Sequence, residues 1–246
     1  MRVTFGVAKR VLTQLRRDPR TLVLVFVVPS LLMALLYWTL IDTPLFGRIA
    51  HAIFALFPFL VMFLVASIAT LRERRSGTLE RTFTMPVSRS SFIAGYALAF
   101  ALLSFVQTLI TVGVCVACLG VEVEGSLWAF FGIALLDALV GTAAGLTASA
   151  FARTEFQVVQ FVPAVVVPQF LLCGLIVPRA DMPTVLEAAS LGMPVTYAVD
   201  AMQAFGGTAA PSSFPQGNAA VDALVLLAFC VVLLGVASLS LRRKTP

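Results

Sequence analysis

Six long apolar runs constrain this chain more than any other feature. They lie at about residues 22–41, 50–71, 92–119, 127–150, 156–177 and 221–241. A helix of about 20 apolar residues spans the roughly 30 Å hydrocarbon core of a membrane, and such runs must be helical because lipid offers no partner for free backbone groups. Only 12% of the 246 residues are charged, whereas a soluble domain has about 25%. The sequence therefore predicts an all-α, polytopic membrane protein that forms one transmembrane domain over residues 1–246.

The distribution of the basic residues predicts how these spans are oriented across the membrane. Of the 17 Lys and Arg residues, 15 lie in the N-terminal arm, the second and fourth loops and the C-terminal tail, which fall on one side of the predicted membrane. Cytoplasmic segments carry the excess of Lys and Arg, so we expect both termini in the cytoplasm. Acidic lipid head groups, and not nucleic acid, are the expected neighbours of these residues. The first run is longer than the apolar part of a signal peptide, so we expect it to be retained as a span.

The N-terminal arm, residues 1–21, has a helical pattern of its own. Val7, Val11 and Leu15 recur at every fourth position, while the basic residues of the arm point elsewhere. This spacing predicts an amphipathic helix that lies along the inner membrane surface. Asp18 and Pro19 should end it, because the residue before a proline resists the helical conformation.

Two further segments outside the spans are expected to contain short helices. In the cytoplasmic loop 72–91, a helix is predicted to begin near Gly77 and to end at Pro86, where proline blocks its continuation. The external segment 178–220 contains apolar stretches at 183–191 and 194–205, which are too short to cross a membrane. We expect these stretches to lie on the outer leaflet or to dip into it.

The residue patterns of several common catalytic and metal sites are missing. The sequence contains no G-x-x-x-x-G-K-[ST] loop, so it cannot bind and hydrolyse ATP by that mechanism. His51 is the sole histidine and is expected at the membrane interface, and Cys115 and Cys118 lie inside a span without a second pair for zinc. Glu122 and Glu124 fit a solvated turn. We therefore expect no catalytic residue, no metal site and no cofactor in this chain.

Asp137 is the most informative single residue. It lies near the centre of the fourth span, where an ionisable group costs at least about 2.5 kcal/mol. Gly141, Gly145 and Ser149 follow it at intervals of four and form a small-residue face of the G-x-x-x-G type, which favours close packing of membrane helices. Asp137 should therefore face protein or a cavity. It is either a cation-attracting or conformationally coupled group in a transport path, or a hydrogen-bond acceptor that fixes helix packing.

The second and fifth spans have features that suit a substrate pathway. The second span is rich in phenylalanine, which suits flat hydrophobic substrates but equally suits contact with lipid. The fifth span combines glutamines with two prolines, and such helices often line pathways that change shape, although a packing kink would explain them nearly as well. The pathway candidates from these two spans are Phe54, Phe57, Pro58, Gln160, Pro163 and Gln169.

The loop after the second span carries a recognisable motif. Glu73, Gly77, Thr78, Leu79 and Glu80, followed by Pro86, Val87, Ser88 and Gly95, resemble the E-x-x-x-G-T-L-E…P-V-S-R…G signature of ABC type-2 transporter permeases. Within that family the chain is most similar to the daunorubicin and doxorubicin resistance efflux permeases of bacteria. The segments 15–20 and 194–201 agree with this resemblance, which covers essentially the whole chain.

The resemblance implies the transmembrane subunit of an ATP-driven exporter in a bacterial inner membrane. Such a subunit pairs with a second permease subunit, and a separate ATP-binding subunit supplies ATP and magnesium. The cargo would be a hydrophobic drug or a lipid-like molecule. The residues implied in coupling to the ATP-binding subunit are Arg74, Gly77, Thr78, Leu79, Glu80, Arg81, Phe83 and Pro86.

Other functions stay open on the sequence alone. A secondary transporter driven by an ion gradient would need several intramembrane charges, and only Asp137 is a clear candidate. An intramembrane enzyme would need a catalytic pair at membrane depth, which the sequence does not offer. An exporter of polysaccharides or lipid-linked glycans would share the family's fold, and a membrane anchor without transport activity would share the same spans.

Overall fold

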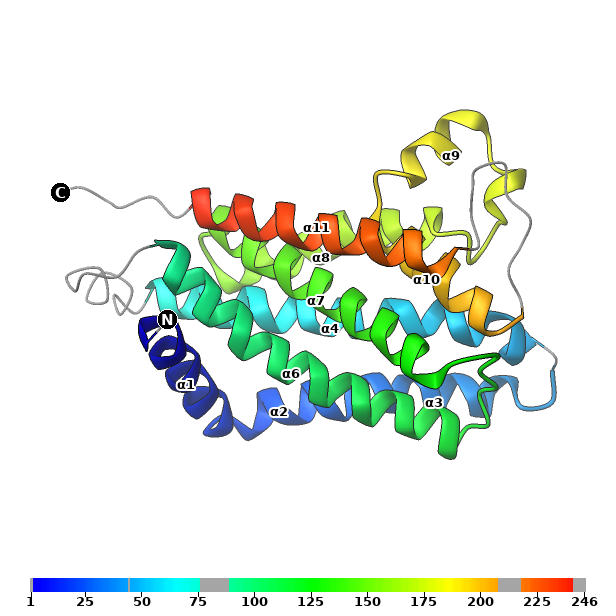
Figure 1. Ribbon diagram of the computed structural model, residues 1–246, viewed down its shortest axis with the longest axis horizontal. Coiled ribbons are helices and arrows are strands. Elements are labelled where there is room, and N and C mark those ends of the chain that lie inside the picture. The colour runs from blue at the N-terminus through cyan, green and yellow to red at the C-terminus, as the bar shows by residue number, and fades with distance from the viewer. Residues whose placement is uncertain (1, 44, 76–88, 208–217, 241–246) are drawn as a thin grey trace.

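A computed structural model describes residues 2–43, 45–75, 89–207 and 218–240 of the chain, and within these ranges it consists of helices and turns (Figure 1). The helices that make up the apolar spans are α2 (Pro19–Phe26), α3 (Val28–Leu40), α4 (Leu45–Arg75), α6 (Arg89–Ala117), α7 (Leu127–Phe151), α8 (Glu155–Leu172) and α11 (Ala219–Ser240). The other elements are α1 (Arg2–Arg16), a 3₁₀ turn η1 (Arg179–Asp181), α9 (Thr184–Ser190) and α10 (Pro194–Phe205). Within these described ranges, six segments are long and apolar enough to cross a membrane, with α2 and α3 forming the first of them together. The predicted all-α, polytopic membrane fold is confirmed.

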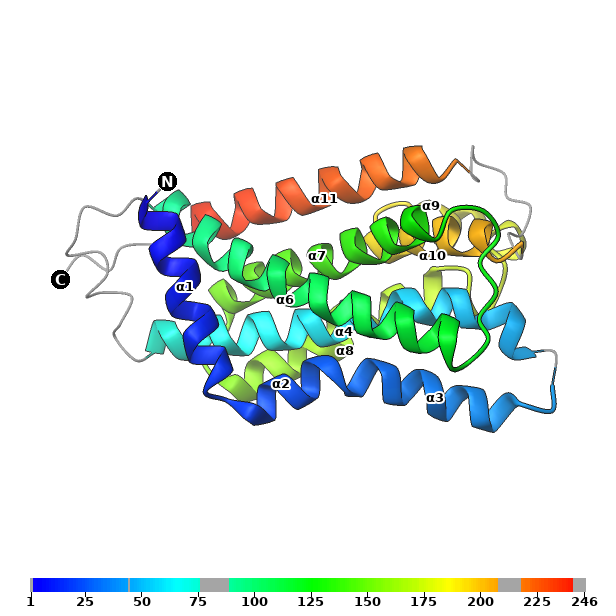
Figure 2. The ribbon, with the colours of Figure 1, turned by 60° about the horizontal axis from the view of Figure 1, so that its bottom comes forward.

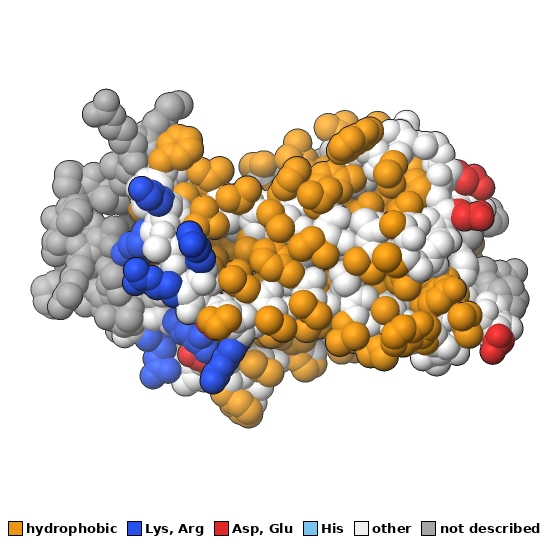
Figure 3. Space-filling view, turned by 90° about the horizontal axis from the view of Figure 1, so that it is seen from below, with side chains coloured by type: hydrophobic (Ala, Val, Ile, Leu, Met, Phe, Trp, Pro, Cys, Tyr) orange, Lys and Arg blue, Asp and Glu red, His pale blue; other side chains and the backbone are white. Residues whose placement is uncertain are grey.

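The two ends of the bundle differ in charge. The arm helix α1, the last turn of α4 and the end of α11 lie at one end, whereas α9 and α10 lie at the other (Figure 1). Lys and Arg side chains gather at the first end, acidic side chains appear at the second, and hydrophobic side chains cover the surface between them (Figure 3). We call the end with α1 the basic end and the other the acidic end.

The first span differs from the prediction at its start and at its middle. It begins at Pro19, three residues earlier than expected, because the Asp18 side chain accepts a hydrogen bond from the Thr21 backbone N–H and caps α2. The helix is then divided at Val27 into α2 and α3. Pro29 lies in the first turn of α3. Proline has no N–H to donate to the preceding turn, which accounts for the break.

The arm helix α1 is docked on protein as well as being amphipathic. Its residues Val7, Val11 and Leu15 are buried in one cluster with side chains of α6. A Cβ atom at Gly95 would lie 2.6 Å from the Cβ of Val7, so the glycine allows α6 to approach the arm closely. Figure 2 shows α1 lying steeply across the end of the bundle. Its buried face therefore contacts the bundle instead of lipid.

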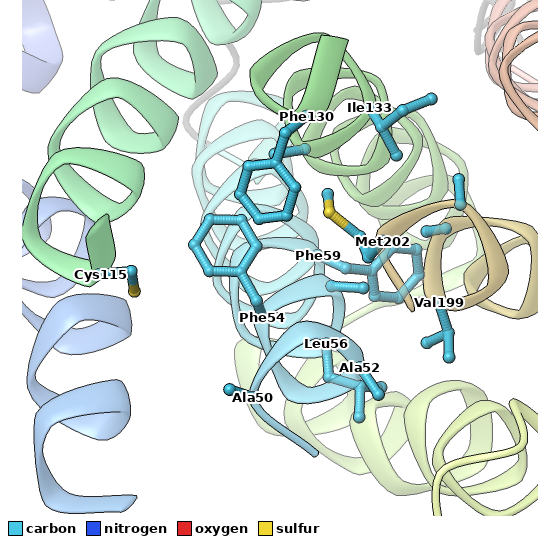
Figure 4. Close-up of a cluster of buried hydrophobic side chains, with 14 of the residues drawn as sticks. Ala50, Ala52, Phe54, Leu56, Phe59, Cys115, Phe130, Ile133, Val199 and Met202 are labelled. Atoms are coloured by element: carbon cyan, nitrogen blue, oxygen red, sulfur yellow. The ribbon is translucent and has the colours of Figure 1, made fainter. Parts of the chain in front are cut away.

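The centre of the bundle is an apolar core shared by α4, α7 and α10. Phe54 and Phe59 of α4, Phe130 of α7 and Met202 of α10 are each at most 1% exposed and meet in this core (Figure 4). Helix α10 buries its apolar face against the bundle. That residues 194–205 lie on the outer leaflet or dip into it stays a prediction. The predicted helix itself is present.

The fifth span is shorter than expected. Helix α8 ends at Leu172 instead of about 177, and the chain turns at Gly174, whose φ of +90° is a left-handed conformation that favours glycine. The helix runs through Pro163 and Pro168 as one element. Each proline removes one N–H from its backbone hydrogen bonds.

Candidate functional site

Helices α4 and α7 pack very closely against each other. A Cβ atom at Gly141 would lie 2.5 Å from the carbonyl oxygen of Phe59, and one at Gly145 would clash in the same way with the carbonyl of Phe63. Backbone therefore packs directly on backbone, as small residues allow in membrane helices. Ser149, the third member of this face, is buried and donates a hydrogen bond to the Leu146 carbonyl.

Asp137 lies one turn before Gly141 on the same helix and is fully buried. Neither of its carboxylate oxygens has a hydrogen-bond partner within the part of the chain that the structure describes. An acid without a partner in an apolar interior is costly. The described residues therefore supply no donor that would make Asp137 a hydrogen-bond acceptor between packed helices.

The other pathway candidates do not form one cluster within this subunit. Phe54 and Pro58 are buried inside the core, where the ring of Phe54 packs 5.3 Å from that of Phe130. Phe57 is half-buried. The Phe54 and Pro58 side chains therefore hold α4 to its neighbours and are not open to a substrate in this arrangement.

The candidates on α8 are divided between its surface and its interior. Gln160 and Pro163 are exposed. Gln169 is buried, and its side-chain oxygen accepts a hydrogen bond of 3.2 Å from the Val195 backbone N–H at the start of α10. Gln169 thus fixes the first turn of α10 to α8, a role that its sequence context did not reveal.

Most of the expected coupling residues lie outside the described residues. These are Gly77, Thr78, Leu79, Glu80, Arg81, Phe83 and Pro86. Arg74 precedes them on α4 and is half-buried, and its guanidinium donates a hydrogen bond to the Ser149 carbonyl oxygen near the end of α7. Cations near a helix C-terminus interact favourably with its unpaired carbonyls.

Ion pairs at the basic end connect the arm to the spans. Arg10 of α1 pairs with Glu73 of α4, whose side chain is only 4% exposed. Arg72 donates two hydrogen bonds, of 2.9 and 3.0 Å, to the carboxylate of Glu155 at the start of α8. The arm and α8 are thus both tied to the last turn of α4, directly before the loop 76–88. The sequence analysis did not identify Arg10 or Glu155, because ion pairs between residues so distant in sequence leave no local pattern.

Asp18 belongs to the same group of charged residues. Hydrogen bonds from Thr21 lower the pKa of this carboxyl, and Arg72, whose guanidinium lies 3.9 Å away, adds to the effect. Asp18 therefore stays ionised at the point where α1 joins the first span.

A second charged group, missed by the sequence analysis, lies near the acidic end. The Arg179 side chain is 3% exposed, and it donates a hydrogen bond of 2.8 Å to Asp200 of α10. Two further nitrogens of Arg179 and one oxygen of Asp222 on α11 are buried without a partner among the described residues. Arg179 is the only basic residue in the segment 178–220, and this was the available sign in the sequence that the arginine needs an acidic partner.

The burial of Asp200 leads us to expect that the free energy of unfolding depends on pH. Burial raises its pKa to about 7, and Arg179 only partly opposes this rise. The folded state favours the protonated form of Asp200. The contribution of this protonated acid to the free energy of unfolding is therefore fully present below its ordinary pKa of 3.8, and it is lost as the pH rises through about 7. We expect the unfolding temperature of the wild type to fall between about pH 6 and pH 8, by the equivalent of about 1 kcal/mol.

The comparison that isolates this effect uses Asp200→Asn, measured by thermal unfolding across the same pH range. The variant should lack this component of the pH dependence, whereas Asp181→Asn, at an exposed position on η1, should retain it. An unchanged pH dependence in Asp200→Asn would show that other groups cause it.

The fold and these sites define a class of protein. The chain is a multi-pass membrane bundle with a docked N-terminal helix and with ion pairs gathered at the last turn of α4. Among the residues that the structure describes, no group of three or more His, Cys, Asp or Glu could hold a metal ion.

Comparison with known proteins gives the family. The family model described as ABC-2 type transporter matches residues 2–205, from the arm through α10. The chain therefore belongs to the ABC-2 type transporter family, and the resemblance found in its motifs is confirmed. It is a transmembrane, permease-type component of such a transporter.

Three curated relatives show how far the similarity extends. The chain is 30% identical to the inner membrane transport permease YhhJ of Escherichia coli over 55% of its own length and 37% of that protein. It is 25% identical to the probable multidrug ABC transporter permease YbhR of E. coli over 56% of its length and 37% of the relative. It is 26% identical to ABC transporter G family member 20 of Dictyostelium discoideum over 73% of its length and 24% of the relative. These matches span less than two-fifths of each relative.

Proposed function

We propose that this chain is the permease subunit of an ATP-driven exporter that moves hydrophobic drugs or lipid-like molecules out of the cytoplasm. It would work with an ATP-binding subunit, which supplies ATP and magnesium, and with a second permease subunit of the same or a related kind. The observation that carries the proposal is the family match, which includes the arm, the loop 76–88 and α10 in one continuous segment. The relative named as a probable multidrug permease supports the choice of cargo.

The proposed orientation places the basic end in the cytoplasm of a bacterium, with the chain in the inner membrane. This follows the rule that cytoplasmic segments carry the excess of Lys and Arg, and those residues gather at the end that holds α1 (Figure 3). The ATP-binding subunit would then contact the loop 76–88. Its movement would reach α4 directly, and it would reach the arm and α8 through the ion pairs of Arg10 and Arg72.

Transport by such a subunit requires two states with different affinity for the cargo. ATP binding can shift the balance between an inward-facing and an outward-facing state only by the difference in its own affinity for them. The proposed pathway lies between two permease subunits and is lined by the second and fifth spans. Gln160 and Pro163 are exposed on α8 and are available to such a shared cavity.

One observation favours a second candidate function. Asp137 is a buried acid that no described residue pairs, and intramembrane acids commonly bind the driving ion in transporters powered by a gradient. An ABC exporter of polysaccharides or lipid-linked glycans is another possible function within the same family.

The test is purification of the chain together with a candidate ATP-binding subunit from the same organism. We expect a stable complex whose ATPase activity responds to the permease, and we expect Glu80→Ala in the coupling loop to reduce assembly or this response by at least about tenfold. Glu122→Ala, at an exposed position near the acidic end, should have no effect. If no ATP-binding protein associates in mild detergent or in nanodiscs, the ion-driven transporter becomes the better account.

A further inference from the structure

A groove at the basic end is not used by any role described above. It has a volume of about 340 Å³ and lies between the arm α1, the first span and the last three turns of α4. Leu24 of α2 together with Leu64 and Ile68 of α4 form part of its apolar floor, and all three are half-buried. Gln14 and Arg20 lie at its polar rim and are exposed. The groove is therefore apolar on its floor and polar along one edge.

The charged side chains that line the groove differ in whether they have an ion-pair partner. Arg72 is paired with Glu155, and Asp18 is occupied by Thr21 and lies near Arg72. The Arg20 side chain makes no ion pair within the described parts of the chain. Asp18 stays ionised and also lines the groove, so the charges around it are mixed. Arg20 is the cation of the lining that is left without an ion pair among the described residues, and its guanidinium can meet an anionic group at the rim.

The position of the groove indicates what occupies it. The Lys and Arg side chains of the basic end border directly on the hydrophobic surface of the helices (Figure 3), and this is the level at which lipid head groups meet acyl chains. A membrane phospholipid has the required chemistry, because its head group carries an anionic phosphate and its tails are apolar. Basic residues at this depth attract acidic lipids in particular.

We propose that this groove binds one anionic phospholipid. Arg20 and the Gln14 amide contact the head group, and one acyl chain lies on Leu24, Leu64 and Ile68. The lipid then fills the space between the arm and α4 and holds the arm against the bundle. This site is independent of the transported cargo, and the proposal does not rest on the direction of transport.

The experiment measures lipid binding to the purified, delipidated chain in mild detergent. Native mass spectrometry counts bound dioleoyl-phosphatidylglycerol against dioleoyl-phosphatidylcholine, and the thermal shift on lipid addition is recorded in parallel. We expect the wild type to prefer phosphatidylglycerol. Arg20→Gln should weaken its binding about fivefold, the factor expected from one surface arginine near an acidic lipid. Ala69→Phe, which fills the apolar floor, should reduce binding of either lipid.

Arg17→Gln is the matched control, because it removes the same charge three positions earlier, and Arg17 does not line this groove. It should retain the preference for phosphatidylglycerol. The proposal is overturned if Arg17→Gln and Arg20→Gln weaken binding equally, which would indicate attraction to the whole basic surface. It is also overturned if both lipids bind the wild type equally, or if Ala69→Phe, with an unchanged unfolding temperature in the absence of lipid, binds as the wild type does.

Discussion

Replacing Gly145 with alanine is expected to lower the unfolding temperature by roughly 5 °C or more. A Cβ at this position would meet the Phe63 backbone carbonyl, and the neighbouring atoms are main-chain atoms that no rotamer change can move. Overpacking of this kind costs about 1–3 kcal/mol, and in a protein of this size each kcal/mol corresponds to about 2–4 °C. Gly145→Leu should prevent folding. Thermal unfolding and size-exclusion profiles of the solubilised protein measure both effects.

Gly132→Ala is the control on the same helix. A Cβ atom at Gly132 would have no heavy atom within 4 Å, so alanine should be tolerated there, and its better helix propensity should stabilise the protein slightly. If Gly145→Ala lowers the unfolding temperature and Gly132→Ala raises it, the contact of Gly145 with α4 is the cause of the loss of stability. If Gly145→Ala and Gly132→Ala behaved alike, the two helices would not be packed backbone to backbone.

Replacing Asp137 with alanine is expected to stabilise the fold while it reduces ATP-coupled transport at least about tenfold. The carboxyl is fully buried, and no described residue gives it a hydrogen bond. Removing an intramembrane acid recovers about 2–3 kcal/mol on insertion scales, which corresponds to a rise of several degrees in unfolding temperature. A residue that lowers stability but is needed for activity gives a more stable and less active protein when it is replaced. Both quantities are measurable on the reconstituted complex.

Ser149→Ala provides the comparison for Asp137. It also removes a buried polar group from α7, but one that already donates a hydrogen bond to the Leu146 carbonyl, so no gain in stability is expected from its loss. A fall in the unfolding temperature of Asp137→Ala would mean that the acid has a partner that stabilises the fold. Unchanged transport in Asp137→Ala would exclude a role for the acid in the pathway.

Local patterns in the sequence were sufficient for much of the fold. Long apolar runs placed the six spans, and the arm helix and α10 followed from apolar spacing and from the prolines that mark helix ends. The interval of four between Gly141 and Gly145 indicated a closely packed face. Each of these features depends on residues within a few helical turns of one another, which is the range over which periodicity and capping act.

Contacts between distant residues could not be predicted in the same way. Gln169 was interpreted as a pathway residue, but its side chain bonds Val195, 26 positions away. Phe54 was interpreted as part of a binding surface, but it packs on Phe130. Phenylalanine and glutamine side chains suit both a cavity and an interior, and only the packing of the helices decides between them. The break in the first span at Val27 depends on a single proline, Pro29, within an otherwise uniform apolar run.

Helix α4 runs without interruption for 31 residues, from the acidic end to the loop 76–88. It continues through Pro58, which removes one N–H from the backbone hydrogen bonds of the helix. The contacts of Gly141 with Phe59 and of Gly145 with Phe63 oppose sliding of α4 along α7. Such a movement would bring the backbone of α4 against larger side chains of α7. We therefore expect α4 and α7 to move as one body, and we expect any bending of the first span to occur where α2 and α3 meet at Val27.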